Sequence, residues 1–275
     1  MQNRAPFAEV SQSVAATNYE PRVVAFLDVL GFSALVQRAD QDVEVRNRLT
    51  GLLNAGKDLA ASNMRERDLK VQNFSDSFIV SASNSWEGLK AIFEFCEQIA
   101  LGFMTIGAAV RGGITVGNAF HDTSIVYGPG VLRAYHLENS VARVPRIVLD
   151  HSALGLARAH VDEFPSPDVS RKSAVLYRDD GDGVVYFNIL RRFGHLVVPH
   201  EDMSNAFSDD DIQRLEKIRK FIQSSIDEHI DNPDVYVKFR WLAIYWNTFV
   251  GVHYTNVGAK NIGWVALGSQ VWTDK

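Results

Sequence analysis

Apolar residues in the first 150 positions recur with two different periods, which divide this part of the chain into strands and helices. Residues 23–26 form an uninterrupted apolar run that is typical of a buried strand. A short helical pattern begins at Ser33, and in residues 43–62 valine and leucine recur at the spacing of a helix with one buried face. The ordered part of the chain is therefore expected to begin with a strand followed by helices.

A hairpin is predicted next, because two short apolar segments, residues 69–74 and 78–83, flank the turn sequence Ser75-Asp76-Ser77. The pattern then predicts a helix at 86–106, a glycine-containing strand at 108–120, a helix at 128–142 and a strand at 145–150. The order β-α-β-β-α-β-α-β is that of a ferredoxin-like βαββαβ sheet of the α+β class, extended by one helix and one strand.

The second half of the chain is less regular. From about 155 to 205 the sequence predicts irregular structure around one strand within 184–190. Two helices follow, and the second, within 234–254, is apolar on more than one face. We predict three parts, which are an N-terminal lead-in at 1–21, one domain at 22–200, and a C-terminal helical extension at 201–275 that packs on the core.

Composition and charge narrow the class of protein. With 275 residues, of which 46% are hydrophobic and 22% charged, the chain is long enough to bury a core. Its net charge of -5 offers no basic face for nucleic acid or an anionic membrane, so neither is an expected partner. Cys96 is the only cysteine and lies in an apolar helical pattern, which predicts a buried, inert thiol. We find no signal-peptide core and no apolar run of about 18 residues, so we expect a cytoplasmic protein.

Two aspartates are candidates for a metal site. Asp28 ends the first predicted strand, and Asp76 lies in the turn of the hairpin that would pair beside it. Two carboxylates held close together repel each other unless a cation lies between them, and Mg²⁺ or Mn²⁺ suits such ligands. The alternative is that Asp28 caps a helix and Asp76 fills an ordinary turn position.

The residues after Asp28 favour a phosphate ligand. Leu30, Gly31 and Phe32 turn directly into a predicted helix, whose free N–H groups can bind phosphate oxygens. A divalent metal next to such a helix start is typical of a site for a nucleoside triphosphate.

Four segments in this order resemble the motifs of class III nucleotidyl cyclases, the adenylate and guanylate cyclase family. The segments are "FLDVLGFS", "KVQNFSDSFIV", "RGGITVG" and "YGPGVLRAYHLE", and the resemblance spans residues 23–150. The sequence is most similar to the bacterial pyrimidine cyclases of Pycsar anti-phage defence, which make cyclic UMP or cyclic CMP. Residues 22–200 would then be a catalytic domain that converts UTP to 3′,5′-cyclic UMP and pyrophosphate, as a second-messenger generator.

The resemblance also implies a cofactor and an assembly. It makes Asp28 and Asp76 the ligands of two divalent metal ions per active site, Mn²⁺ or Mg²⁺, with the carbonyl of Val29 as a further ligand. In the family the metal aspartates come from one subunit, while the base-selecting strand and the helix after "Y-G" come from the other. A homodimer with sites at its interface is therefore expected. The product would be read by a separate effector protein.

The chain departs from the purine cyclases at the positions that bind ribose, α-phosphate and base. Leu132 and His136 stand where those enzymes carry Asn and Arg, so Arg133 or His136 would have to stabilise the α-phosphate. A surface role for both is the alternative.

Gln72 stands where the purine cyclases carry a base-selecting Lys or Glu, and its amide can both donate and accept. This departure argues against ATP and GTP and leaves UTP and CTP open. Arg65 or Arg67 is a further candidate for the base, with an exposed loop arginine as the alternative. Arg111 matches a family arginine or is structural, and the glycines beside it indicate a bulge or a close backbone approach. A catalytically silent nucleotide-binding module is the alternative function, motivated by Leu132 and His136.

Overall fold

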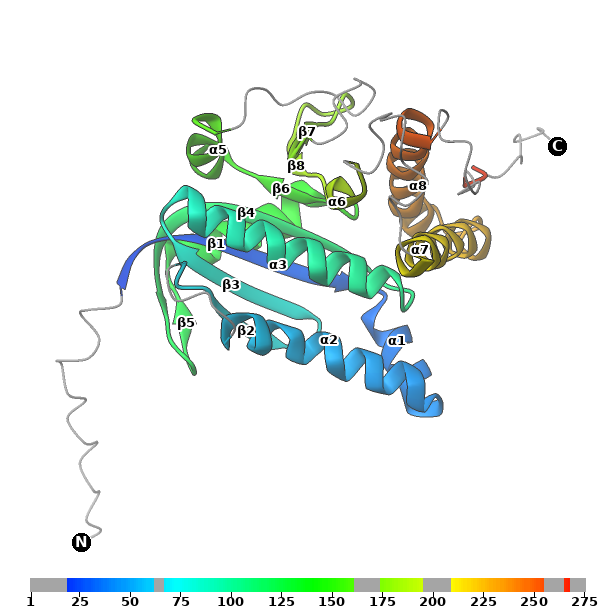
Figure 1. Cartoon of the computed structure of the whole chain (residues 1–275), viewed down its shortest axis with the longest axis horizontal. Coiled ribbons are helices and arrows are strands. Elements are labelled where there is room, and N and C mark those ends of the chain that lie inside the picture. Colours follow the sequence, from blue (N-terminus) through cyan, green and yellow to red (C-terminus); the bar gives the residue numbers. More distant parts are fainter. Residues whose placement is uncertain (1–18, 62–66, 161–173, 195–208, 255–264, 268–275) are drawn as a thin grey trace, which may run out of the picture.

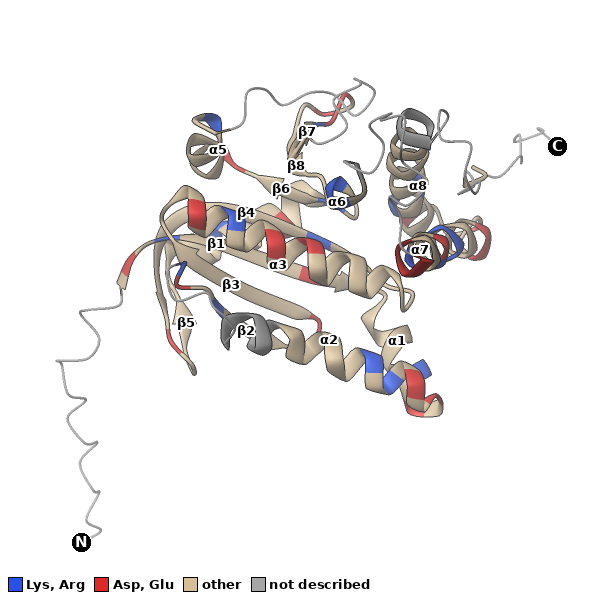
Figure 2. Ribbon diagram, in the orientation of Figure 1, with Lys and Arg blue, Asp and Glu red and all other residues tan. Residues whose placement is uncertain are grey.

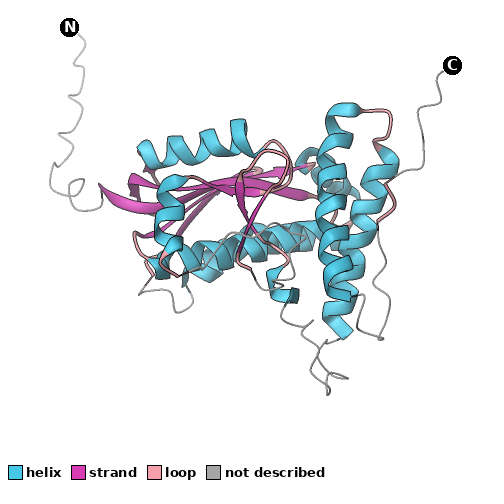
Figure 3. Cartoon of the chain, turned by 90° about the horizontal axis from the view of Figure 1, so that it is seen from above, coloured by secondary structure: helices cyan, strands magenta, loops and turns pink. Residues whose placement is uncertain are grey.

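The computed structural model describes residues 19–61, 67–160, 174–194, 209–254 and 265–267. A sheet lies between helices on both of its faces, and a pair of C-terminal helices stands at one end (Figures 1 and 3). The elements up to residue 150 are β1 (Tyr19–Leu30), α1 (Phe32–Gln41), α2 (Val43–Ala61), β2 (Lys70–Phe74), β3 (Ser77–Ser83), α3 (Trp86–Met104), β4 (Ala109–His121), β5 (Val126–Tyr127), α4 (Pro129–His136), the π-helix η1 (Leu137–Ala142) and β6 (Ile147–Leu149). They are followed by α5 (His151–Arg158), β7 (Leu176–Arg178), β8 (Val185–Phe187), α6 (Arg191–Gly194), α7 (Asp209–Glu228) and α8 (Pro233–Tyr254).

The sheet has the predicted topology. Its strand order is β2-β3-β1-β4-β6-β8-β7, and β5 pairs with β4. The first four strands pair antiparallel at every step, which is the ferredoxin-like arrangement. β6 joins β4 in parallel, as a strand that follows a crossover helix does. The predicted α+β class is confirmed, and so is the order of the elements up to β6, except for the additional short strand β5 between β4 and α4.

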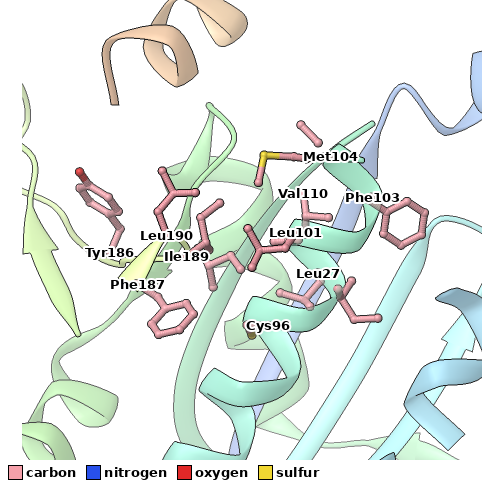
Figure 4. Packing of buried hydrophobic residues seen from close by; sticks show 14 of the residues in the cluster. Leu27, Cys96, Leu101, Phe103, Met104, Val110, Tyr186, Phe187, Ile189 and Leu190 are labelled. Atoms are coloured by element: carbon pink, nitrogen blue, oxygen red, sulfur yellow. The ribbon is translucent and has the colours of Figure 1, made fainter. Parts of the chain in front are cut away.

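β1 is buried on both faces, which explains why it reads as an uninterrupted apolar run. Side chains at alternate positions, including Leu27, face the large core under α3, and Figure 4 shows Leu27 near Leu101 and Val110. On the opposite face Val24 and Phe26 pack against α4. Asp28 follows Phe26 on this second face, so the alternation of β1 places its carboxylate away from the large core.

Several elements differ from the prediction. β7 lies in a segment predicted to be irregular, and it was missed because its three residues pair only with β8. α5 begins directly after β6, where the Asp150 side chain accepts hydrogen bonds from the N–H groups of Ser152 and Ala153. β1 begins at Tyr19, inside the segment predicted as a lead-in, because Tyr19 pairs with Phe120 of β4.

The two C-terminal helices form as predicted and contribute to the same core. Leu215 and Ile218 of α7 are fully buried, as is Trp246 of α8. The Tyr245 hydroxyl lies 2.5 Å from Asn188 Oδ1 and accepts from Leu190 N–H at 3.1 Å. Within the described ranges, no helix is long and apolar enough to cross a membrane.

Cys96 is fully buried in α3, and burial raises the pKa of its thiol well above the ordinary value. The prediction of a buried thiol is confirmed.

Candidate functional site

The β2–β3 hairpin brings Asp76 next to Asp28. Asp28 pairs with Ser77 across β1 and β3, and Asp76 directly precedes Ser77. The N–H of Val29 donates to the Asp76 carbonyl oxygen at 3.0 Å and so ties the turn to the end of β1. The two aspartates that the sequence singled out therefore lie together at the end of the sheet.

Burial and charge both act on Asp28. Its pKa is raised because burial disfavours the charged carboxylate, and the nearby Asp76 adds to this effect. Arg111 opposes both influences by attraction and by a hydrogen bond from Nε to Asp28 Oδ2 at 3.3 Å. Lys238 of α8 also lowers the pKa of Asp28 by attraction. A further cation beside Asp28 would therefore be stabilised by the site.

Arg111 lies between two carboxylates. It stands opposite Asp28 in the β1–β4 register, and its Nε lies 2.5 Å from Oε1 of Glu138. The Glu138 side chain is only 3% exposed, and this oxygen has no aligned hydrogen-bond donor. Burial raises the pKa of Glu138 to about 7, with Arg111 lowering it and Asp28 and Asp76 raising it further.

Glu138 reaches this position because η1 lies against β4. Glu138 belongs to the π-helical turn that continues α4, and π-helical turns are frequent at functional sites. A Cβ atom on Gly113 of β4 would lie 2.3 Å from Leu137 Cβ and 2.9 Å from the Glu138 nitrogen. Only glycine permits this approach, so the predicted close backbone contact is confirmed here.

The residues present fit a divalent cation of the Mg²⁺ or Mn²⁺ type. Asp28 and Asp76 would supply carboxylate oxygens to such a cation, which would offset the repulsion that Asp76 exerts on Asp28. Among the described residues no cluster of three or more His, Cys, Asp or Glu forms a complete metal site. Two carboxylates leave coordination positions for phosphate oxygens and water, which is how Mg²⁺ is held at nucleotide sites.

The predicted phosphate-binding turn is open to solvent. Gly31 caps α1 in the left-handed conformation, with φ +85°, and no side chain caps this helix start. Leu30 and Gly31 line a cleft of about 810 Å³ whose other wall is formed by α7 and α8. Phe32, the first residue of α1, is half-buried and packs against the core.

The other residues predicted for the site do not belong to the group formed by Asp28, Asp76, Arg111 and Glu138. Gln72 on β2 donates from Nε2 to the Ser124 carbonyl oxygen at 3.1 Å, while its Oε1 is buried without a partner. Arg133 on α4 donates from Nε to Asp150 Oδ2 at 3.0 Å. His136 is exposed. In the described part of the chain neither Arg133 nor His136 contacts Asp28 or Asp76, and Arg65 lies outside the described residues.

Two functional candidates were missed from the sequence. Glu138 is the last residue of the segment "YGPGVLRAYHLE". The signal in the sequence was an acidic residue directly after an apolar one. Lys238 is far from Asp28 along the chain, and no local pattern relates the two residues. Arg67, the second candidate for base contact, forms an ion pair with Glu94 at 2.7 Å.

Comparison with known proteins finds similarity to solved structures only. No family model and no curated protein sequence matches the chain. The adenylyl cyclase CyaB from P. aeruginosa is 16% identical, with a TM-score of 0.42, and the match covers 61% of this chain and 94% of that one. The catalytic core of a rhodopsin-guanylyl cyclase with converted specificity is 14% identical, with a TM-score of 0.43 and coverage of 62% and 96%.

The monomeric guanylyl cyclase domain of a fusion protein from the aquatic fungus Blastocladiella emersonii is 15% identical, with a TM-score of 0.41 and coverage of 62% and 94%. The chain is thus similar to catalytic domains of adenylyl and guanylyl cyclases.

Proposed function

We propose that the chain is a nucleotide cyclase that converts UTP to 3′,5′-cyclic UMP and pyrophosphate at a site built on Asp28 and Asp76. The observation that carries the proposal is the hydrogen bond from Val29 N–H to the Asp76 carbonyl, which joins the hairpin turn to the end of β1. It holds the turn that carries Asp76 against the strand that carries Asp28, and this strand leads into the helix start at Gly31, which has no side-chain cap. This combination suits a metal-bound triphosphate.

The reaction is an intramolecular displacement. The 3′-oxygen of the ribose forms a bond to the α-phosphorus, the bond from that phosphorus to the α–β bridging oxygen breaks, and the hydroxyl proton leaves to solvent. Asp28 and Asp76, with the Val29 carbonyl, would hold two divalent ions, which when bound activate the hydroxyl and offset charge on the leaving pyrophosphate. The chain itself would have to position the triphosphate so that the attacking and leaving oxygens lie in line.

Arg111 is a second source of positive charge in this site. Glu138 holds one edge of its guanidinium, and the side chain is 20% exposed, so donors remain for a phosphate oxygen. Because Arg111 already neutralises Asp28 in part, it also keeps the pair of aspartates compatible with the folded chain before substrate binds.

Base selection is assigned to Gln72, acting in the site of a partner subunit. The buried, unpartnered Oε1 of Gln72 supports a role in binding, since such an atom is usually satisfied by a ligand or water. An amide matches the mixed donor and acceptor edge of uracil, and it also matches cytosine after rotation. A cytidylate cyclase that makes cyclic CMP is therefore the alternative. Arg133 or His136 of the partner would stabilise the α-phosphate.

The test is incubation of the purified protein with each of the four ribonucleoside triphosphates and Mn²⁺, with products resolved by mass. Cyclic UMP from UTP is expected, and Asp76→Ala is the matched inactive control. Cyclic CMP alone would move the assignment to the cytidylate alternative. A product formed only from ATP or GTP would contradict a pyrimidine cyclase.

A catalytically silent nucleotide-binding module is the second candidate. The contact between Arg111 and Asp28 favours it, because a guanidinium there could take the place of a metal ion. In that case UTP would bind in the presence of Mn²⁺, and no cyclic product would form over several hours.

The proposed biological role is a cytoplasmic second-messenger generator in bacterial anti-phage defence, with a separate effector protein that binds the product. Co-expression of the chain with its effector should reduce phage replication, and Asp76→Ala should remove the protection. Equal protection by this variant would contradict the role.

A further inference from the structure

A cleft lies between the start of α1 and the C-terminal helix pair. Its volume is about 810 Å³, and it begins at Leu30 and Gly31, directly after the strand end that carries Asp28. α7 contributes Phe221 and Ser224, and α8 contributes Phe239. Asp28 and Asp76 are not among the lining residues, so the cleft adjoins the carboxylate pair and does not contain it.

The cleft is strongly cationic. Its lining includes the positively charged side chains of Arg38, Arg48, Lys217, Lys220 and Lys238, against a single carboxylate, Glu228. Lys and Arg segments can be followed on both walls, on α1 and α2 and on α7 and α8 (Figure 2). For a chain with a net charge of -5 this is a local concentration of positive charge, which attracts anions into the cleft.

The cations on the α1–α2 wall have structural partners. Arg38 Nη2 donates to the Ile106 carbonyl oxygen at 2.5 Å, and Arg48 Nη2 donates to Thr105 Oγ1 at 2.8 Å. Both arginines thus bind the turn after α3, which fixes the shape of this wall.

The lysines on α7 and α8 have fewer polar partners than the arginines on the opposite wall. Lys220 lies 4.0 Å from Glu216 and is 70% exposed. Lys217 and Lys238 form no ion pair with any residue in the ranges that the structure describes. Lys238 is half-buried, and the cations that line the cleft outnumber its one carboxylate, Glu228. A half-buried ammonium with no ion pair is stabilised by a bound anion.

We propose that this cleft binds the β- and γ-phosphates of the nucleotide, with Lys238 of α8 and Lys217 of α7 as phosphate-binding residues of the same chain. The inference rests on the proposed function, since it takes the anion to be the triphosphate whose α-phosphate lies beside Asp28. The C-terminal helices then form one wall of the active site. Lysine acts here as a flexible point charge, which suits a leaving pyrophosphate.

The test measures binding of inorganic tripolyphosphate by calorimetry, without added metal, to the wild type, Lys217→Met and Lys238→Met. Methionine keeps most of the side-chain length and removes the charge. Each substitution should weaken binding roughly tenfold or more, because a lost charge-assisted contact is worth at least that factor. Lys238→Arg should retain most of the affinity. Lys90→Met is the control, because Lys90 lies on α3 and pairs with Glu87 at 2.7 Å, away from the cleft. Thermal unfolding verifies that each variant is folded.

The outcomes separate this inference from the proposed function. Tripolyphosphate binding that depends on Lys217 and Lys238 supports the inference, even if no nucleotide is cyclised and the proposed function fails. Cyclisation of UTP with unchanged KM and unchanged tripolyphosphate binding in both methionine variants would overturn the inference and leave the cyclase assignment in place. Absence of tripolyphosphate binding to the wild type would also overturn it.

Discussion

Glu138 shows how one buried side chain links the fold to the chemistry of the site. Its carboxylate is almost fully buried in the π-helical turn η1 and lies against Arg111, which in turn binds Asp28. Burial and the two nearby aspartates raise its pKa from 4.5 to about 7. Glu138 therefore changes its charge near pH 7, next to the two aspartates that are candidates for metal binding.

This shift predicts a pH-dependent stability. The folded chain binds the Glu138 proton more tightly than the unfolded chain, so the contribution to stability is full below pH 4.5 and is lost as the pH rises through about 7. Replacing Glu138 by Gln removes that loss. The free energy of unfolding of Glu138→Gln minus that of the wild type should therefore rise by on the order of 1–3 kcal/mol from pH 5 to pH 8.

Urea unfolding at pH 5, 6, 7 and 8 measures this difference. If the free energies of unfolding of the variant and the wild type differ by the same amount at every pH, Glu138 has an ordinary pKa. The less buried Glu94→Gln provides a control with no expected pH effect from this site.

At the scale of elements, the β2–β3 hairpin is what places Asp76. Its turn residue Ser75 has φ 54°, a left-handed conformation that costs a residue with a Cβ about 1–2 kcal/mol and costs glycine little. The hydrogen bond from Val29 N–H to the Asp76 carbonyl then holds the turn against β1. The geometry of the carboxylate pair is therefore set by a two-residue turn under local strain.

Substitutions at Ser75 should separate turn conformation from side-chain chemistry. Ser75→Val should lower the free energy of unfolding by about 1–2 kcal/mol, because a β-branched residue is rarely found at positive φ. Ser75→Gly should match or slightly exceed the wild type. Thermal unfolding and cyclase activity measured together would test this, and a fully stable, fully active valine variant would argue against a strained turn.

At the scale of the whole molecule, the residues of the proposed site fall into separate groups on one chain. Asp28 and Asp76 lie together, while Arg133 is bound to Asp150 and Gln72 to the Ser124 carbonyl. Near these elements, Leu132 on α4 is 70% exposed and Phe74 beside the hairpin turn is 85% exposed. Large apolar side chains left exposed are what a subunit interface would cover.

Mixing inactive variants tests whether sites are shared. An Asp28→Ala chain mixed with a Gln72→Ala chain should regain activity, because half of the sites in a mixed dimer would be intact. A mixture of Asp28→Ala with Asp76→Ala should remain inactive, since both changes affect the same half-site. Equal behaviour of the two mixtures would contradict the homodimer prediction.

The sequence predicted what local patterns determine. The strand β1 and the turn around Asp76 could be predicted from local sequence patterns. The pairing of β1 with the hairpin could also be predicted, because the ferredoxin-like topology puts them side by side. The contact of Glu138 with Arg111 was not readable, because it depends on the close approach of η1 to Gly113. The lysines of the C-terminal helices were missed for the same reason, since only long-range packing brings Lys238 near Asp28.

The central claim is that the chain cyclises a nucleotide at Asp28 and Asp76, and the stoichiometry of the products tests it most directly. Phosphorus NMR of UTP incubated with the protein and Mg²⁺ distinguishes cyclisation from hydrolysis. Cyclic UMP and pyrophosphate should appear in equal amounts with the wild type, and neither should appear with folded Asp28→Ala or Asp76→Ala. Release of UMP or UDP with inorganic phosphate, or unchanged product formation in either variant, would contradict the account.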